Sequence, residues 1–296
     1  MCIRNRLISL IFRIIIIMFC SLGLYLNSGI PNGELAKYML VFFTIQSNLL
    51  CFGYFSVVLF QNIKDLKNKG IYGTTRILPR FKGGVTLVIA VTFLIYHIVL
   101  APQFISNSIH YNIFTMQNLT VHYIVPILVI VDWLLFDEKL SFKWFDPFIW
   151  LSLPIIYFVF ILIRAKIGSI IEILSSYYPY FFIDVDLIGW QNVLLNSAAM
   201  LLAFLALGYS IYFINNIFFK HVSWLFTKVF AVVFSKVSTI FYSRVFAVVF
   251  SKMYAVVFAK VFAVVFSKVF AKFISKPYQE PYSNSQQAPA EVLLTN

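Results

Sequence analysis

A hydroxyl and an imidazole stand inside two apolar stretches of this sequence, and together they could carry out nucleophilic chemistry. Thr44 lies in residues 42–50 and His122 in residues 119–136. Polar and ionisable side chains within a membrane span are costly and usually serve a function. Threonine attacks a carbonyl carbon when a neighbouring base removes its proton, and histidine is the usual base. The pair therefore predicts acyl transfer by a Thr44 nucleophile and a His122 general base, with Ser47 as a rival nucleophile.

Four further polar side chains are expected near the depth of this pair. They are Asn48, His97, Asn118 and Asn196. At about 1.5 Å per helical residue, Thr44 and His122 both lie about 13 Å inside the expected outer edge of the membrane. The same count places His97 about 12 Å deep and Asn196 about 9 Å deep, and the other two asparagines flank this layer. All four are candidate binding residues, and the amide of Asn48 or Asn118 could donate to an oxyanion.

The same residues also admit a purely structural interpretation. A threonine in a helix often bonds its own backbone, and histidine and asparagine side chains hold membrane helices together. A zinc site would need a third ligand beside His97 and His122, and the sequence offers none at that level. We therefore expect neither a metal nor a cofactor.

A proline follows His122 by four residues, at Pro126. Proline has no backbone N–H, so the carbonyl of His122 loses its helical hydrogen-bond partner. We expect a distortion of the helix here, and a freed carbonyl that needs another partner, such as water in a cavity.

The composition identifies the chain as an integral membrane protein. Of its 296 residues 61% are hydrophobic and 11% are charged, with a mean hydropathy of +0.89, whereas soluble domains carry about 25% charged residues. A membrane-spanning helix needs about 20 mostly apolar residues, and six stretches qualify. They are residues 7–27, 35–60, 85–105, 113–136, 145–163 and 190–213. Because lipid satisfies no backbone group, the spans must be helices, and we predict an all-α polytopic fold.

The net charge of +12 indicates how the chain is oriented in the membrane. Basic residues are frequent before the first span, after the second and beyond the sixth. Cytoplasmic loops are enriched in Lys and Arg, so both termini are predicted to face the cytoplasm. We expect anionic lipid headgroups, and no nucleic acid, as partners. Arg13, inside the first span, is expected to extend its side chain toward those headgroups.

Two other features have more than one interpretation. Asp132 lies near the inner end of the fourth span and could be an interfacial anchor, a helix-packing contact or part of a site. We favour a structural role. Tyr177, Tyr178 and Tyr180 precede the sixth span. They form either an aromatic belt at the membrane surface or a lid over the polar layer.

The chain divides into three predicted regions. Residues 1–216 form the six-span domain, and residues 217–276 form a basic, apolar tail. This tail repeats the octad VFAVVFSK at residues 229–236, 245–252 and 261–268. We expect it to be interfacial or of low complexity, with lysines extending to an anionic surface. Residues 277–296 are polar and are expected to be disordered.

Three segments carry a resemblance to a known family. They are FTIQSNLL, VHYIVPILVIVDWLLF and YPYFFIDVDLIGWQNVLLN. They resemble the bacterial family of predicted six-span membrane proteins (Pr-six-Pr), over about residues 7–216. That family is distantly similar to the androgen-induced and FAR-type eukaryotic membrane proteins, some of which hydrolyse fatty-acid esters of hydroxy fatty acids with an intramembrane threonine and histidine.

The resemblance implies a lipid-ester hydrolase in a bacterial inner (plasma) membrane. By motif, its threonine corresponds to Thr44 and its histidine to His122, whereas Ser47 has no counterpart in the eukaryotic pattern. Two other functions remain open: a small-solute transporter or channel that uses the same polar layer, and a non-catalytic membrane scaffold. Against transport, the sequence shows no paired glycine-interrupted half-helices.

Overall fold

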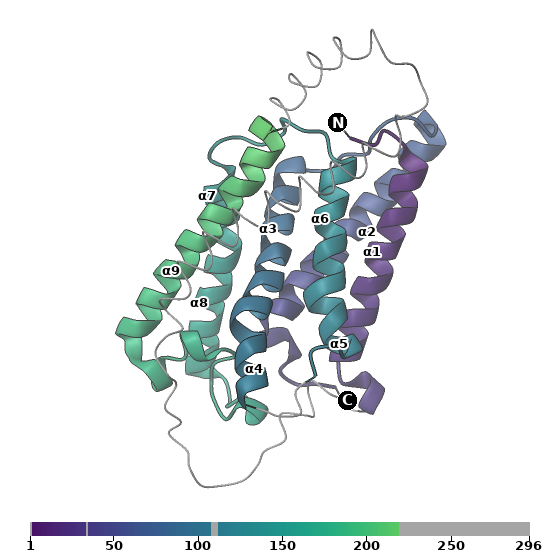
Figure 1. The fold of residues 1–296 in the computed structure, drawn as a ribbon. Coiled ribbons are helices and arrows are strands. Elements are labelled where there is room, and N and C mark those ends of the chain that lie inside the picture. Colours follow the sequence, from purple (N-terminus) through teal and green to yellow (C-terminus); the bar gives the residue numbers. More distant parts are fainter. Residues whose placement is uncertain (1, 34, 108–111, 219–296) are drawn as a thin grey trace. The chain divides into compact units, whose positions relative to one another are not determined.

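The structure is a computed structural model that describes residues 2–33, 35–107 and 112–218 (Figure 1). Within these ranges every regular element is helical. In the described part of the chain, six helical regions are long and apolar enough to cross a membrane, which confirms the predicted all-α class and agrees with six candidate spans. They are Arg6–Asn27, Phe43–Lys69, Pro79–Ser106, Met116–Phe136, Asp146–Ile167 and Val185–Asn216. From residue 219 onward, the predicted tail and C-terminus lie outside the described residues.

Several of these regions consist of more than one element. The first two are α1 (Arg6–Asn27) and α2 (Phe43–Lys69). The third joins α3 (Pro79–Ile95), the π-helical turn η3 (Tyr96–Leu100) and α4 (Ala101–Asn107), and the fourth joins α5 (Met116–Leu119), the π-helical turn η4 (Thr120–Ile124) and α6 (Val125–Phe136). The last two contain α7 (Asp146–Trp150) and α8 (Ser152–Ile167), then α9 (Val185–Phe213) and η7 (Ile214–Phe218). The loops hold short 3-10 turns: η1 (Ile30–Asn32), η2 (Met39–Val41), η5 (Glu172–Leu174) and η6 (Phe181–Ile183).

The second helix begins later than the sequence predicts. Residues 35–42 contain the turn η2 and an extended Phe42, and α2 starts only at Phe43. Thr44 therefore lies in the first turn of its helix, so counting helical rise from residue 35 does not apply to it. An apolar composition marks the membrane but does not mark the residue at which a helix begins.

Helix α3 forms the centre of the described bundle. Its most apolar stretch is 83% buried, against at most 50% for the other five regions. Helices α1, α2, α3 and α6 pack in a closed ring around a core that includes Ile16, Phe55, Ile89 and Val129, while α7, α8 and α9 pack beside α3 (Figure 1). A glycine in α3 permits close packing against α7, because a Cβ at Gly83 would lie 2.2 Å from the Trp150 ring.

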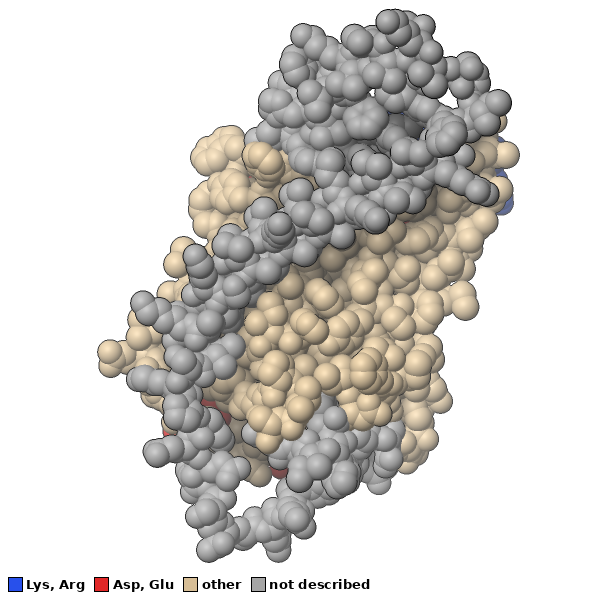
Figure 2. All heavy atoms as spheres, in the orientation of Figure 1, with Lys and Arg blue, Asp and Glu red and all other residues tan. Residues whose placement is uncertain are grey.

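The helices alternate in direction, so their ends form two groups (Figure 1). We call the end where α1 begins and α6 finishes the charged end, and the end where α2 begins the threonine end. Between them, the described part of the face in Figure 2 is almost free of Lys, Arg, Asp and Glu. An uncharged surface between polar ends is what a lipid environment requires.

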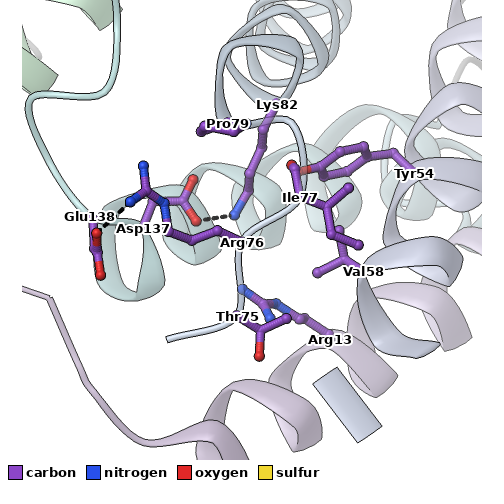
Figure 3. Close-up of a pocket in the computed structure, with 10 residues that line it drawn as sticks. All are labelled: Arg13, Tyr54, Val58, Thr75, Arg76, Ile77, Pro79, Lys82, Asp137 and Glu138. Atoms are coloured by element: carbon purple, nitrogen blue, oxygen red, sulfur yellow. Dashed lines mark hydrogen bonds and ion pairs between the residues drawn. The ribbon is translucent and has the colours of Figure 1, made fainter. Parts of the chain in front are cut away.

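The charged end is held by buried ion pairs. Arg13 is 1% exposed and donates to the Asp132 carboxylate over 3.2 Å. Lys82 is also buried and donates to Asp132 and to Asp137. Figure 3 shows the Lys82–Asp137 pair and, nearer to solvent, Arg76 paired with Glu138 over 2.6 Å. The expectation that Arg13 extends to the headgroups is therefore wrong. A carboxylate on α6 lies within reach, so the guanidinium is neutralised inside the bundle.

Candidate functional site

The structure brings Thr44 and His122 together at the threonine end. The Thr44 hydroxyl oxygen lies 3.3 Å from His122 Nε2. Thr44 comes from the first turn of α2 and His122 from the π-helical turn η4, which are 78 residues apart in sequence. The distance is that of a nucleophile and base in hydrogen-bond contact.

The second ring nitrogen of His122 fixes the tautomer. Nδ1 lies 3.2 Å from the backbone carbonyl of Asn118, which can only accept, so Nδ1 carries the proton. Nε2 is then left with a lone pair that faces the Thr44 hydroxyl. The ring of Tyr96 stacks on the imidazole, with centroids 3.6 Å apart and planes tilted by 15°. The imidazole is therefore held in the orientation that a general base requires.

The π-helical turn gives this region its local geometry. It covers Thr120–Ile124 and ends two residues before Pro126, where the sequence predicts a distortion. Within the turn, the carbonyl of Val121 accepts a hydrogen bond from Asn48 Nδ2 over 3.1 Å. Such single-turn π segments occur frequently at functional sites.

Asn48 is a positioning residue in this geometry. Its side chain is fully buried, and Nδ2 also donates to the backbone carbonyl of Thr44 over 2.8 Å. Both amide protons are thus committed to backbone carbonyls, one on α2 and one on η4. The structure therefore gives Asn48 a role in joining the two catalytic candidates, and it leaves no proton for an oxyanion.

Ser47 faces away from the imidazole. Its hydroxyl contacts Thr92 Oγ1 over 2.7 Å and donates to the carbonyl of Thr44 over 2.8 Å. The side chain is 1% exposed, between α2 and α3. This arrangement favours Thr44 over Ser47 as the nucleophile.

The other three candidates lie around the pair in different ways. Asn118 supplies its backbone carbonyl to His122, while its side-chain amide donates to the Asn112 carbonyl over 3.3 Å. Asn196 donates to the Phe182 carbonyl over 3.1 Å and so ties α9 to η6. His97 is exposed, and its ring contacts Tyr123. Their shared depth, inferred from the sequence, does not bring these side chains into one cluster.

A cavity of about 400 Å³ opens beside Thr44. It lies among the start of α2, the helices α3, α8 and α9, and the turn η6. Its lining is almost entirely apolar, with Val91, Leu194, Leu201 and Phe204 among the side chains that face it. This cavity can hold an alkyl chain with a polar group against the Thr44 hydroxyl.

Two aromatic residues at the site were not assigned a chemical role from sequence. Tyr96 stacks on His122, and the Tyr180 hydroxyl accepts a hydrogen bond from the backbone N–H of Phe43 over 3.1 Å. Tyr180 also lines the cavity. Only the tyrosine cluster before the sixth span pointed to it, through the interpretation as a lid.

Comparison with protein-family models, with curated proteins and with solved structures finds no match. Among the described residues, no group of three or more His, Cys, Asp and Glu side chains could hold a metal ion. Any function must therefore be argued from the geometry of the chain itself.

Proposed function

We propose that this chain is a multi-pass membrane protein that hydrolyses a lipid ester, with Thr44 as nucleophile and His122 as general base. One observation carries the proposal: the Thr44 hydroxyl lies 3.3 Å from the unprotonated nitrogen of an oriented imidazole. The apolar cavity beside Thr44 supports a fatty-acyl ester over a small polar solute.

The reaction follows from these contacts. As the Thr44 oxygen attacks the ester carbonyl carbon, His122 Nε2 takes the hydroxyl proton. The tetrahedral intermediate then expels the alcohol, which receives that proton, and an acyl-threonine remains. Water enters, gives a proton to His122 and attacks the acyl carbon. The second tetrahedral intermediate breaks its bond to the Thr44 oxygen, which takes the proton back from His122, and the fatty acid is released. Throughout, the Asn118 carbonyl holds the Nδ1 proton and stabilises the imidazolium.

We also propose the orientation that the basic residues favour. The charged end and both termini face the cytoplasm of a bacterial inner membrane, where exposed lysines such as Lys64 and Lys67 contact anionic headgroups. The threonine end then lies in the outer half of the bilayer, so a lipid could reach the cavity from within that leaflet.

A fluorophosphonate probe tests the nucleophile directly. Detergent-solubilised full-length protein is treated with the probe beside the variants Thr44→Ala, Ser47→Ala and His122→Ala. Labelling should disappear in Thr44→Ala, fall in His122→Ala and persist in Ser47→Ala. Loss only in Ser47→Ala would move the nucleophile. No labelling of the folded protein would remove the hydrolase proposal and favour solute binding by the same cavity.

A further inference from the structure

The Tyr180 ring is fixed over the start of α2 by packing. It stacks on Phe182, with ring centroids 5.2 Å apart and planes 4° from parallel. It also makes a T-shaped contact with Phe42, with ring centroids 6.2 Å apart. Its hydroxyl accepts from the Phe43 N–H, one of the first-turn donors that a helix leaves without an internal partner. The phenol oxygen is therefore held beside Thr44 by both its ring and its own hydrogen bond.

The hydroxyl group of Tyr180 lies next to Thr44 in the cavity lining. The Phe43 bond uses an oxygen lone pair and therefore does not use the O–H. The Thr44 side chain and backbone N–H, and the Tyr157 hydroxyl, also lie close enough to this oxygen to hydrogen-bond with it. Burial raises the pKa of Tyr180 above its ordinary value of 10.0, so the phenol keeps its proton at neutral pH.

A second tyrosine in the cavity provides a contrast. Tyr157 also lines the cavity, but its O–H donates to the backbone carbonyl of Val41 over 3.0 Å. Its proton is thus committed to the protein, as are both amide protons of Asn48. Of these three side chains, Tyr180 is the one placed to donate to a substrate.

We propose that the Tyr180 hydroxyl donates a hydrogen bond to the oxyanion formed when Thr44 attacks an ester, an inference that rests on the proposed hydrolase function. The electron pair of the carbonyl double bond moves onto its oxygen, and that oxygen accepts the hydrogen bond. No proton is transferred, and the bond weakens again when the carbonyl reforms and the alcohol leaves. Such donors act mainly in the transition state, so their loss lowers kcat more than it raises KM.

The test compares two phenylalanine variants of the full chain with para-nitrophenyl octanoate as the probe. Tyr180→Phe keeps the ring and should lower kcat about 10²-fold with KM changed by less than about threefold. Tyr178→Phe removes a hydroxyl from the same loop, at a residue that does not line the cavity, and should lower kcat by less than about twofold. Thermal melting of both variants reports whether the fold is retained.

A fluorinated tyrosine at position 180 separates a donor from a structural hydroxyl. Fluorination lowers the pKa of the phenol, so activity should be lost at a lower pH than in the unmodified protein. An unchanged pH profile, or a Tyr180→Phe variant that keeps kcat within about threefold, would overturn the inference while Thr44 labelling still stood. If the unmodified protein neither hydrolyses the probe nor is labelled at Thr44, the proposed function fails and the inference with it.

Discussion

The two ends of the helical bundle treat polar groups in opposite ways. At the charged end, Arg13 pairs with Asp132, and Lys82 pairs with Asp132 and Asp137, so these four charges are neutralised inside the protein. At the threonine end, Thr44 and His122 form a neutral pair beside an apolar cavity. At the charged end the polar groups are used in ion pairs that join the helices. At the threonine end a hydroxyl and a lone pair are available for a reaction.

The difference has an energetic basis. A buried ion pair contributes little net stability, yet removing one partner strands the other and costs about 3–5 kcal/mol. A neutral hydrogen-bonded pair carries no such penalty, and its net contribution is about 1 kcal/mol. We therefore expect variants of the charged end to change stability and variants of the threonine end to change turnover.

The largest effect is expected from the nucleophile itself. Thr44→Val replaces the hydroxyl with a methyl group of similar size, so hydrolysis should fall by at least about 10³-fold while the melting temperature changes little. Thr44→Ser keeps a hydroxyl and is the matched control, which should retain measurable turnover. Equal activity of the valine and serine variants would exclude Thr44 as the nucleophile.

Removing the shared carboxylate should break the other end. Asp132→Ala removes the carboxylate that pairs with Arg13, while Lys82 keeps only Asp137. Because the Arg13 guanidinium stays buried, the free energy of unfolding should fall by about 3–5 kcal/mol. Denaturation in detergent measures the loss. The fraction that stays folded should still react at Thr44 with the fluorophosphonate at the normal rate. Normal stability would show that these charges are hydrated rather than paired.

Filling the cavity should change which esters are accepted. Ala198 lines the cavity, and Ala199, its neighbour on α9, is not among the lining residues. Ala198→Phe should lower turnover of long-chain para-nitrophenyl esters about 10-fold relative to the acetate ester, because a phenyl ring occupies the space of several methylene groups. Ala199→Phe is the control and should leave this ratio unchanged; an equal shift in both variants would place the acyl chain elsewhere.

The smallest effect is expected where an ion pair meets solvent. Arg76 and Glu138 are 2.6 Å apart, but their side chains are 43% and 33% exposed. Glu138→Gln should therefore change the free energy of unfolding by less than about 1 kcal/mol. A loss as large as that of Asp132→Ala would show that this pair belongs to the buried network.

The sequence predicts the helices and the contact of Thr44 with His122 better than it predicts the surroundings of these residues. Stretches of about 20 apolar residues are sufficient to identify candidate spans, and a hydroxyl or an imidazole within such a stretch is evident from the sequence. The ion pair of Arg13 could not be predicted in this way, because Asp132 lies 119 residues away in sequence. For Arg13 considered alone, the lipid headgroups are the expected partner. Likewise, only the packing of α3 shows that Ser47 is bound to Thr92.

The carbonyl that orients His122 belongs to the main chain of Asn118, and this has a consequence for genetics. No side-chain replacement at position 118 deletes a backbone carbonyl. A saturation mutagenesis screen should therefore find positions 44 and 122 intolerant without revealing the third member of the group. Substitutions at Pro126 should instead impair activity. They restore a backbone N–H, which allows the segment to form a regular α-helix in place of the π-helical turn that holds His122.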